Sequence, residues 1–267
     1  MADSVNRRWE SMTTVDAEAL SQSDPVVILP LGAIEQHGPH LPLSTDLEIG
    51  TGILEYALRL LPVDFPAWVL PPQAVGCSGE HERFPGTLSI EPHLLSGVLY
   101  ALGAAVARCG AKRVVISNSH GGNVSAVDSA ALELRRKHGL LVTKSHYFLF
   151  PRPDGVELPD LEWRHGLHGG AIETALMLHL RPDLVRESLA QDTPSLGQSL
   201  ERSLRHVSPA AAGASFAWMA EDLSASGVTG NATLATVALG KRLLDGYGRM
   251  LAEVIRETRD FPIEQLT

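Results

Sequence analysis

The sequence predicts a three-layer α/β/α fold with a mainly parallel sheet. Strand-like and helix-like segments alternate along the chain, which is the pattern of parallel strands joined by crossover helices. The first strand-like segment, 26–31, is continuously apolar and is bounded by Pro25 and Gly32, as expected of a buried strand. The 267 residues, 44% of them hydrophobic and 20% charged, are enough to bury a sizeable core. We therefore expect a single domain over residues 1–267.

Four strands are expected, and each has a local signal. The apolar run 26–31 is the first, and 67–70 is the second, ended by a Pro-Pro pair. The sequence RVVIS at 113–117 is the third, and the run 140–147 is the fourth. Because helical segments separate these runs, we expect the strands to lie parallel.

The helices are predicted from apolar spacing and from their ends. The segment 47–61 carries Leu, Ile and Ala at helical spacing, and 92–108 begins with Pro92 and is followed by Gly110. The segment 124–137 is amphipathic, and 171–180 follows a double glycine. The expected helices are 14–22, 47–61, 92–108, 124–137, 171–180 and 233–257. Residues 73–90 are predicted to be a loop, and 183–229, rich in Ser, Ala and Pro, to be irregular.

Composition excludes several classes of protein. The net charge is -9, with 31 acidic against 22 basic residues, so no basic surface for nucleic acid is expected. No apolar run approaches the ~20 residues of a membrane span, and residues 1–16 lack the apolar region of a signal peptide. Cys77 and Cys109 are the only cysteines, which favours a reducing compartment. We expect a cytoplasmic protein that binds neither nucleic acid nor membrane.

Dense polar clusters follow each predicted strand. The segments 35–46, 78–87, 118–123 and 147–170 come after strands one to four in turn. In parallel sheets, sites form at the carboxyl ends of the strands. The clusters should therefore meet at one edge of the sheet, and a purely structural protein has no reason to collect its histidines there.

The first of these clusters predicts metal binding. Glu35 and His37 are two residues apart, so on an extended stretch they point to the same side, and Asp46 follows. A carboxylate and an imidazole presented together suit Zn²⁺ or Mn²⁺. The alternative is a polar loop between a strand and a helix.

Two later histidines precede double glycines. His120 stands before Gly121 and Gly122, where the alternative to a ligand is a helix-capping turn closed by Asn123. His168 also precedes two glycines, and Glu173 follows five residues later in the first turn of a helix. A carboxylate is favourable at a helix N-terminus without any metal. Otherwise, one of His168 and Glu173 could ligate while the other handles protons.

Taken together, these motifs resemble the creatininase family of metal-dependent amidohydrolases. The resemblance rests on LGAIEQHGPHLPLSTD, GEHERFPGTLSI, NSHGGN, HGGAIET and GVTGNATLAT, in the family's order. It implies a layered α/β fold, a two-metal site, hydrolysis of a carbon–nitrogen bond and a homohexamer. By position, the residues that match family metal ligands are Glu35, His37, Asp46 and His120. Asp46 matches the carboxylate that bridges the metals, and His168 matches the histidine that moves a proton at the substrate.

The sequence departs from creatininase itself at two places. Creatininase has a glutamate ligand two residues after the histidine equivalent to His120, where this chain has Gly122, so Glu173 is the natural substitute ligand. The two tryptophans that creatininase sets against creatinine fall on Phe148 and near Arg164. The resemblance therefore supports the reaction class better than the substrate. The candidates for substrate contact are Ser78, His81, Phe148 and Trp218, with Trp163 also nearby.

The expected chemistry is hydrolysis of an amide. Two divalent ions, Zn²⁺ or Mn²⁺ or both, would share a bridging water and lower its pKa, giving the hydroxide that attacks the carbonyl. The first candidate substrate is a small cyclic amide. The alternative is a small precursor peptide, trimmed by a peptidase of the mycofactocin type, and a third possibility is a non-catalytic protein that only holds metal. If segment 186–229 leaves the pocket open, a peptide substrate is favoured. If it closes the pocket, a small ring is favoured.

Overall fold

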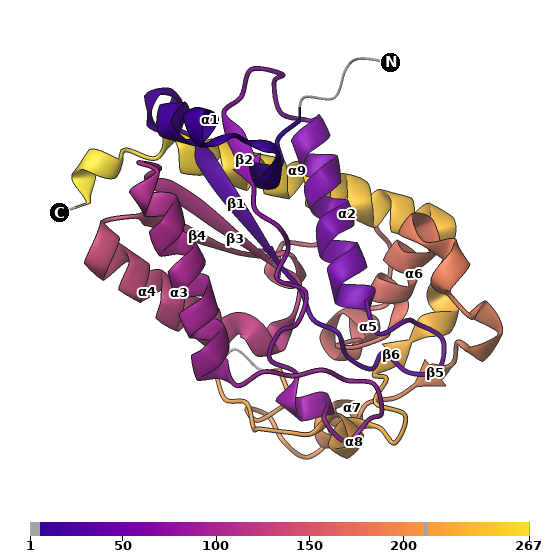
Figure 1. Cartoon of the computed structure of the whole chain (residues 1–267). Helices are drawn as coiled ribbons and strands as arrows, with labels where there is room; N and C mark the ends of the chain where they lie inside the picture. The colour runs from indigo at the N-terminus through magenta and orange to yellow at the C-terminus, as the bar shows by residue number, and fades with distance from the viewer. Residues whose placement is uncertain (1–5, 211–212, 267) are drawn as a thin grey trace.

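The computed structural model describes residues 6–210 and 213–266. A four-stranded sheet lies at its centre, with the order β2-β1-β3-β4 and every neighbouring pair parallel (Figure 1). The predicted parallel sheet is therefore confirmed. Its strands are β1 (Val26–Leu31), β2 (Ala67–Val69), β3 (Arg113–Asn118) and β4 (Leu141–His146).

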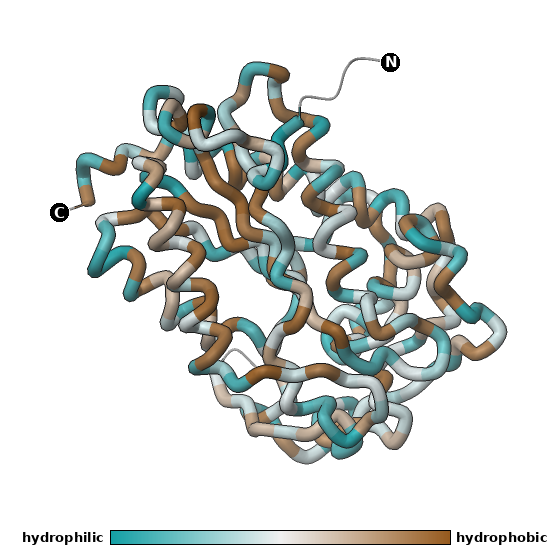
Figure 2. The backbone as a smooth tube through the Cα atoms, viewed as in Figure 1, coloured by the Kyte–Doolittle hydropathy of each residue, from teal (hydrophilic) through white to brown (hydrophobic). Residues whose placement is uncertain are grey.

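Side chains of β1 alternate between two hydrophobic cores, one on each face of the sheet. Val26 and Ile28 belong to the first core, whereas Val27 and Leu29 belong to the second. All six residues of β1 are buried, which explains why its sequence is continuously apolar rather than alternating. In Figure 2 the strands run as apolar stretches through the middle of the molecule.

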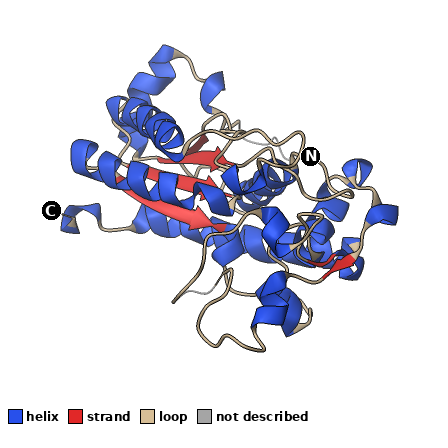
Figure 3. Cartoon of the chain, turned by 90° about the horizontal axis from the view of Figure 1, so that it is seen from below, coloured by secondary structure: helices blue, strands red, loops and turns tan. Residues whose placement is uncertain are grey.

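Helices cover both faces of the sheet, giving the three predicted layers (Figure 3). The first core is closed by α2 (Thr45–Arg59), α6 (Ala171–Leu180) and α9 (Val237–Asp260). The second is closed by α3 (Pro92–Arg108) and α4 (Val124–His138). Among the described residues, no helix combines the length and apolar character needed to cross a bilayer.

Several predicted helix ends differ from the structure. The first helix, α1, spans only Thr14–Ala19 and passes into a 3-10 turn at Leu20–Ser23. Helix α2 begins two residues before the predicted start. Helix α9 begins at Val237 because the Thr236 side chain accepts a hydrogen bond from Leu239 N and caps it.

Short elements that the sequence did not predict lie after β4. Helix α5 (Asp160–His165) lies between β4 and α6. The segment 183–229 is not wholly irregular, because it contains α7 (Leu196–Leu200) and α8 (Ala220–Leu223). Within it, β5 (Asp192–Thr193) also pairs antiparallel with β6 (Gly230–Asn231). Helices of four to six residues show too little apolar periodicity to be predicted from sequence.

Candidate metal centre

The carboxyl ends of β1 and β3 bring the first predicted ligands together. Leu31 at the end of β1 is in register with Asn118 at the end of β3. The loop after β1 carries Glu35 and His37, and His120 lies two residues beyond β3, so the three side chains leave adjacent strands at the same edge. Asp46 and Glu173 join them from the first turns of α2 and α6.

The Asp46 carboxylate lies between two imidazoles. Its Oδ1 is 3.4 Å from His37 Nε2, and its Oδ2 is 3.4 Å from His120 Nδ1. Glu35 lies beside the His120 contact of Asp46, with Oε2 3.2 Å from His120 Nε2. Glu173 lies beside the His37 contact, with Oε2 3.8 Å from His37 Nε2. All five predicted ligands therefore converge on one cluster.

The donor set fits a pair of cations that share Asp46. Glu35, His37 and Asp46 are almost fully buried, yet both carboxylate oxygens of Glu35, Asp46 Oδ2 and His37 Nε2 have no hydrogen-bond partner. Buried polar atoms without partners are costly, and a bound cation would satisfy them. Two groups of donors lie close enough to hold an ion and have Asp46 in common, namely Glu35, Asp46 and His120, and His37, Asp46 and Glu173.

Backbone contacts orient the two histidine ligands. His37 Nδ1 is 3.1 Å from the carbonyl oxygen of Glu35, and His120 Nε2 is 2.8 Å from that of Cys77. A ring nitrogen that donates to a carbonyl leaves the other nitrogen as the free lone pair. The free atoms are then His37 Nε2 and His120 Nδ1, which are the two atoms nearest Asp46.

The metal-free centre has strongly shifted pKa values. Burial, followed by the charge of Asp46, raises the pKa of Glu35 well above its ordinary value. Burial also raises the pKa of Glu173, to about 7. Burial would lower the pKa of His37, but Asp46 and Glu173 outweigh it and raise the pKa to about 9. The centre attracts positive charge, whether as protons or as metal ions.

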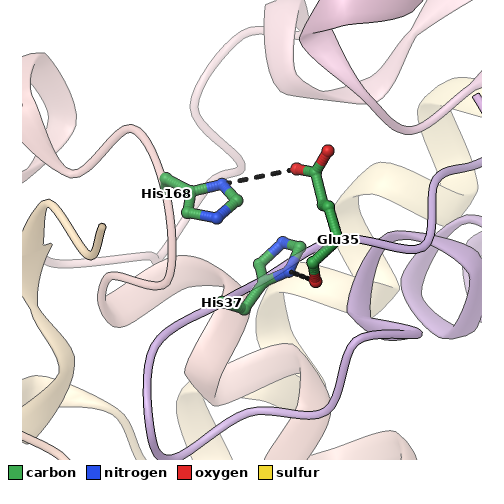
Figure 4. Close-up of side chains that lie close together, drawn as sticks. All are labelled: Glu35, His37 and His168. Carbon is green, nitrogen blue, oxygen red and sulfur yellow. Dashed lines mark hydrogen bonds and ion pairs between the residues drawn. The ribbon is translucent and has the colours of Figure 1, made fainter. Parts of the chain in front are cut away.

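His168 reaches the same cluster from the loop before α6. Its Nε2 is 2.5 Å from the carbonyl oxygen of Gln36, and its Nδ1 faces Glu35 Oε1 at 3.7 Å (Figure 4). If Nε2 donates to Gln36, Nδ1 is left as a proton acceptor directed at the centre. Burial, and then the neighbouring His37 and His81, lower the pKa of His168 well below its ordinary value. The ring is therefore neutral, and one of its nitrogens carries no proton.

The loop after β2 contributes more than sequence reasoning foresaw. His81, predicted as a candidate for substrate contact, is buried, with Nε2 3.4 Å from Glu35 Oε1. Gln36, which the sequence did not single out, bonds through Nε2 to His81 Nδ1 at 2.8 Å and donates to Gly227 O at 3.2 Å. Ser78 is buried, and its hydroxyl opposes the rise in the pKa of Glu35. The only sequence signal for Gln36 was its place between two ligands.

The three aromatic residues considered for substrate contact each have other partners in the structure. Phe148 is 37% exposed and its ring lies 5.6 Å from that of His146. The indole N–H of Trp218 donates to Pro209 O at 3.1 Å, in the segment before α8. Trp163 packs against the first core and under the Arg152 guanidinium, 5.0 Å away.

Asn123 does not cap α4 as predicted. Its side-chain oxygen accepts from Cys77 N at 2.8 Å, while Nδ2 donates to Gly32 O and Asn118 Oδ1, both at 3.0 Å. Asn123 therefore ties together the chain segments that follow β1, β2 and β3. Asn123 stands at the N-cap position of α4, but its side chain holds three loops together instead of capping the helix.

A parallel sheet with carboxylates and imidazoles buried at its carboxyl edge defines an α/β enzyme with a candidate metal centre. The sequence model of the family described as "Creatininase: Creatinine amidohydrolase" matches residues 10–255. The chain therefore belongs to the creatininase family, and it is a hydrolase of carbon–nitrogen bonds.

Individual relatives have two different activities in their names. The chain is 35% identical over 237 residues to the mycofactocin precursor peptide peptidase of Mycolicibacterium smegmatis, which covers 86% of this chain and 84% of that protein. It is 32% identical over 191 residues to the creatinine amidohydrolase of Pseudomonas putida, covering 66% and 72%. A zinc–zinc form of a creatininase mutant matches with a TM-score of 0.72 and 29% identity, over 96% of this chain and 98% of that chain. The predicted family, fold class and enzyme class are confirmed.

Proposed function

We propose that this chain is a two-metal amidohydrolase that cleaves an amide bond in a short peptide. The convergence of five donors around the shared Asp46, with their buried lone pairs unsatisfied, carries the metal part of the proposal. Zn²⁺ and Mn²⁺ both accept carboxylate and imidazole ligands. The zinc–zinc form of a creatininase mutant supports the proposal of two metal ions.

Each side chain then has a defined task. Glu35, His37, Asp46, His120 and Glu173 would hold the two cations. When bound, such cations acidify a water and polarise the amide carbonyl. His168 Nδ1 takes a proton from the attacking water as the new carbon–oxygen bond forms. It passes that proton to the departing nitrogen as the carbon–nitrogen bond breaks, a task suited to a neutral imidazole.

A hollow bordered by the two sequence neighbours of His37 favours a peptide over a small ring. An open hollow of about 400 Å³ borders Gln36 and Gly38, the two neighbours of His37. Its wall has no charged side chain and is completed by Pro39, Leu43, Phe84, Pro85 and Ser226. This hollow would accept an apolar side chain next to the cleaved bond. The identity to the precursor peptide peptidase, extending over 86% of the chain, supports the same choice.

A small cyclic amide is the second candidate. It is favoured by the identity to creatinine amidohydrolase, which covers 66% of this chain. By the family resemblance we propose a homohexamer, which size-exclusion chromatography with light scattering would test. From the two cysteines we propose a cytoplasmic location, which cell fractionation would test. The case for a flat ring such as creatinine is weakened because the two tryptophans of creatininase fall on Phe148 and near Arg164 in this chain.

The decisive experiment begins with metal analysis of the purified protein. The metal-free protein is then loaded with Mn²⁺ or Zn²⁺ and assayed on short apolar peptides, lactams and hydantoin-like rings, with Asp46→Ala as the inactive control. We expect about two metal equivalents and cleavage of peptides. Turnover of rings alone would favour the second candidate, and a wild-type protein that binds no metal would overturn the proposal.

Phe84→Ala separates the two substrate classes further. Since Phe84 lines the hollow and is not a proposed ligand, its loss should raise KM for apolar peptides and leave metal content unchanged. Equal KM values for wild type and Phe84→Ala on every peptide would exclude the hollow as the binding site.

A further inference from the structure

Glu162 is a buried carboxylate that the proposed chemistry does not use. It lies on α5 and is only 5% exposed. Its Oε1 accepts a hydrogen bond from Ala171 N at 2.7 Å, and its Oε2 accepts one from Asn231 N at 2.7 Å. One carboxylate thus joins two loops that are 60 residues apart in sequence.

Each loop bonded by Glu162 leads to the centre. Ala171 is the first residue of α6, whose N-terminal neighbour Gly170 has no side chain to cap it, and Glu173 follows in the first turn. A carboxylate at this helix end satisfies an otherwise unpaired N–H and is favoured by the helix dipole. The other loop is already attached to His168, because Thr229 N donates to His168 O at 2.8 Å.

Three glycines make room for the carboxylate. A Cβ at Gly170 would lie 2.5 Å from Glu162 Oε1, and one at Gly230 would lie 2.7 Å from it. Gly166 approaches the same oxygen so closely that a Cβ there would also overlap it. Gly230 has a φ of 120°, a conformation that glycine adopts far more readily than other residues. The GLHGG and TGN segments therefore enclose the carboxylate closely.

We propose that Glu162 is a positioning residue that sets Glu173 and His168 against His37 through these two loops. The catalytic consequence rests on the proposed function, whereas the effect on the loops does not. Residues that orient metal ligands typically change metal affinity or activity by about 10–100-fold when replaced. Without the clamp, the start of α6 is free to shift relative to the 229–231 loop, and Glu173 no longer has a fixed distance to His37.

Glu162→Gln is the first test, because it keeps the shape of the side chain but replaces one acceptor oxygen by an NH₂ group that faces a backbone N–H. Glu201→Gln is the matched control. Glu201 is 41% exposed and contacts α5 as well, because its Oε1 accepts from Arg164 Nε at 3.1 Å and lies 2.8 Å from His165 Nε2. It bonds neither of the two loops that Glu162 joins. Both variants and the wild type are compared without metal by hydrogen exchange and with Mn²⁺ by titration calorimetry, followed by kcat and KM on the best peptide.

We expect Glu162→Gln to exchange faster at 168–173 and 229–231, to bind Mn²⁺ at least about tenfold more weakly and to lose kcat more than KM. Glu201→Gln should match the wild type. The proposal would be overturned if a folded Glu162→Gln protein had the same amide hydrogen exchange as the wild type at 168–173 and 229–231. It would also be overturned if that protein bound Mn²⁺ with the same affinity as the wild type. A wild type that binds Mn²⁺ but cleaves no substrate would overturn the proposed function alone.

Glu162→Asp gives a second, independent variant. It retains the charge but is one methylene too short to span both amides, so the same faster exchange and weaker Mn²⁺ binding are expected. If Glu162→Gln and Glu162→Asp both fail to fold, Glu162 serves folding rather than positioning, and the proposal is wrong.

Discussion

The imidazole ring of His168 stacks on that of His37, with ring centroids 4.0 Å apart and planes inclined by 28°. His168 also stacks on His81, at 4.2 Å and 27°. Two charged imidazoles would repel each other in this arrangement, and His37 is the ring whose pKa is raised by its carboxylates. His168 is therefore the neutral member of the pair, which separates a proton-handling ring from a metal-binding one.

His168→Ala should retain metal and lose turnover. The donors around Asp46 remain complete without His168, so metal content measured by mass spectrometry should stay at the wild-type level. The loss in kcat should be about 10²–10⁴-fold, the usual range for a proton-transfer group. His138→Ala, at an exposed histidine on α4, is the control. Since His168 also lies close enough to Glu35 and His37 to share an ion, a metal-free His168→Ala protein would identify it as a ligand instead.

Metal binding should release protons at neutral pH. His37, with a pKa of about 9, and Glu173, with a pKa of about 7, both hold protons in the metal-free protein near pH 7. A donor binds metal only when it is deprotonated, so the apparent affinity should rise as the pH rises from 6 to 9. Calorimetry in buffers of different ionisation enthalpy measures the protons released. Glu173→Gln should release fewer, and a binding enthalpy independent of buffer would contradict the pKa assignments.

Gly122→Ala should disrupt the centre through a single methyl group. A Cβ at Gly122 would lie 2.5 Å from His120 Nε2 and 2.8 Å from Glu80 Oε1, and it would overlap the Cys77 carbonyl. His120 must then shift from its position beside Asp46. We expect metal affinity to fall at least about tenfold, in the range found when the orientation of a ligand is disturbed.

Gly121→Ala is the matched control for that substitution, since a Cβ at Gly121 would meet nothing within 4 Å. It should bind metal like the wild type. Equal metal affinity of Gly122→Ala and Gly121→Ala would show that the crowding around His120 relaxes without cost to the centre.

The centre could be located from the sequence because sites in parallel sheets form at the carboxyl ends of the strands, and the parallel arrangement of the strands could be predicted. The continuous apolar run of β1 predicted a strand buried on both faces, and the parallel order then placed Glu35, His37 and His120 at one edge. The converging positions of Asp46 and Glu173 followed from the family resemblance as well as from the helices that carry them. These signals are local or are fixed by strand order.

The supporting residues were beyond such reasoning, because their partners are remote in sequence. Gln36 bonds a carbonyl 191 residues away, and Glu162 bonds an amide 69 residues away. Asn123 carried a local signal as a helix cap, but its side chain instead forms hydrogen bonds with residues 46 and 91 positions away in the sequence. His81 showed no ligand spacing, and only the packing of the loop after β2 against Glu35 reveals its place.

The packing of α9 on α6 provides a stability prediction, because α6 carries Glu173. A Cβ at Gly240 would overlap the carbonyl group of Ala175, and backbone cannot move aside as a flexible side chain can. Gly240→Ala should therefore lower the free energy of unfolding by about 1–3 kcal/mol, the usual cost of overpacking. Gly97→Ala, in the exposed middle of α3 with nothing within 4 Å of the added Cβ, should instead raise it by up to about 1 kcal/mol, because alanine favours a helix. Urea unfolding of the metal-free proteins measures both changes, and the opposite signs separate steric crowding at Gly240 from helix propensity. If Gly240→Ala were as stable as Gly97→Ala, α9 would not pack against α6 as closely as the structure shows.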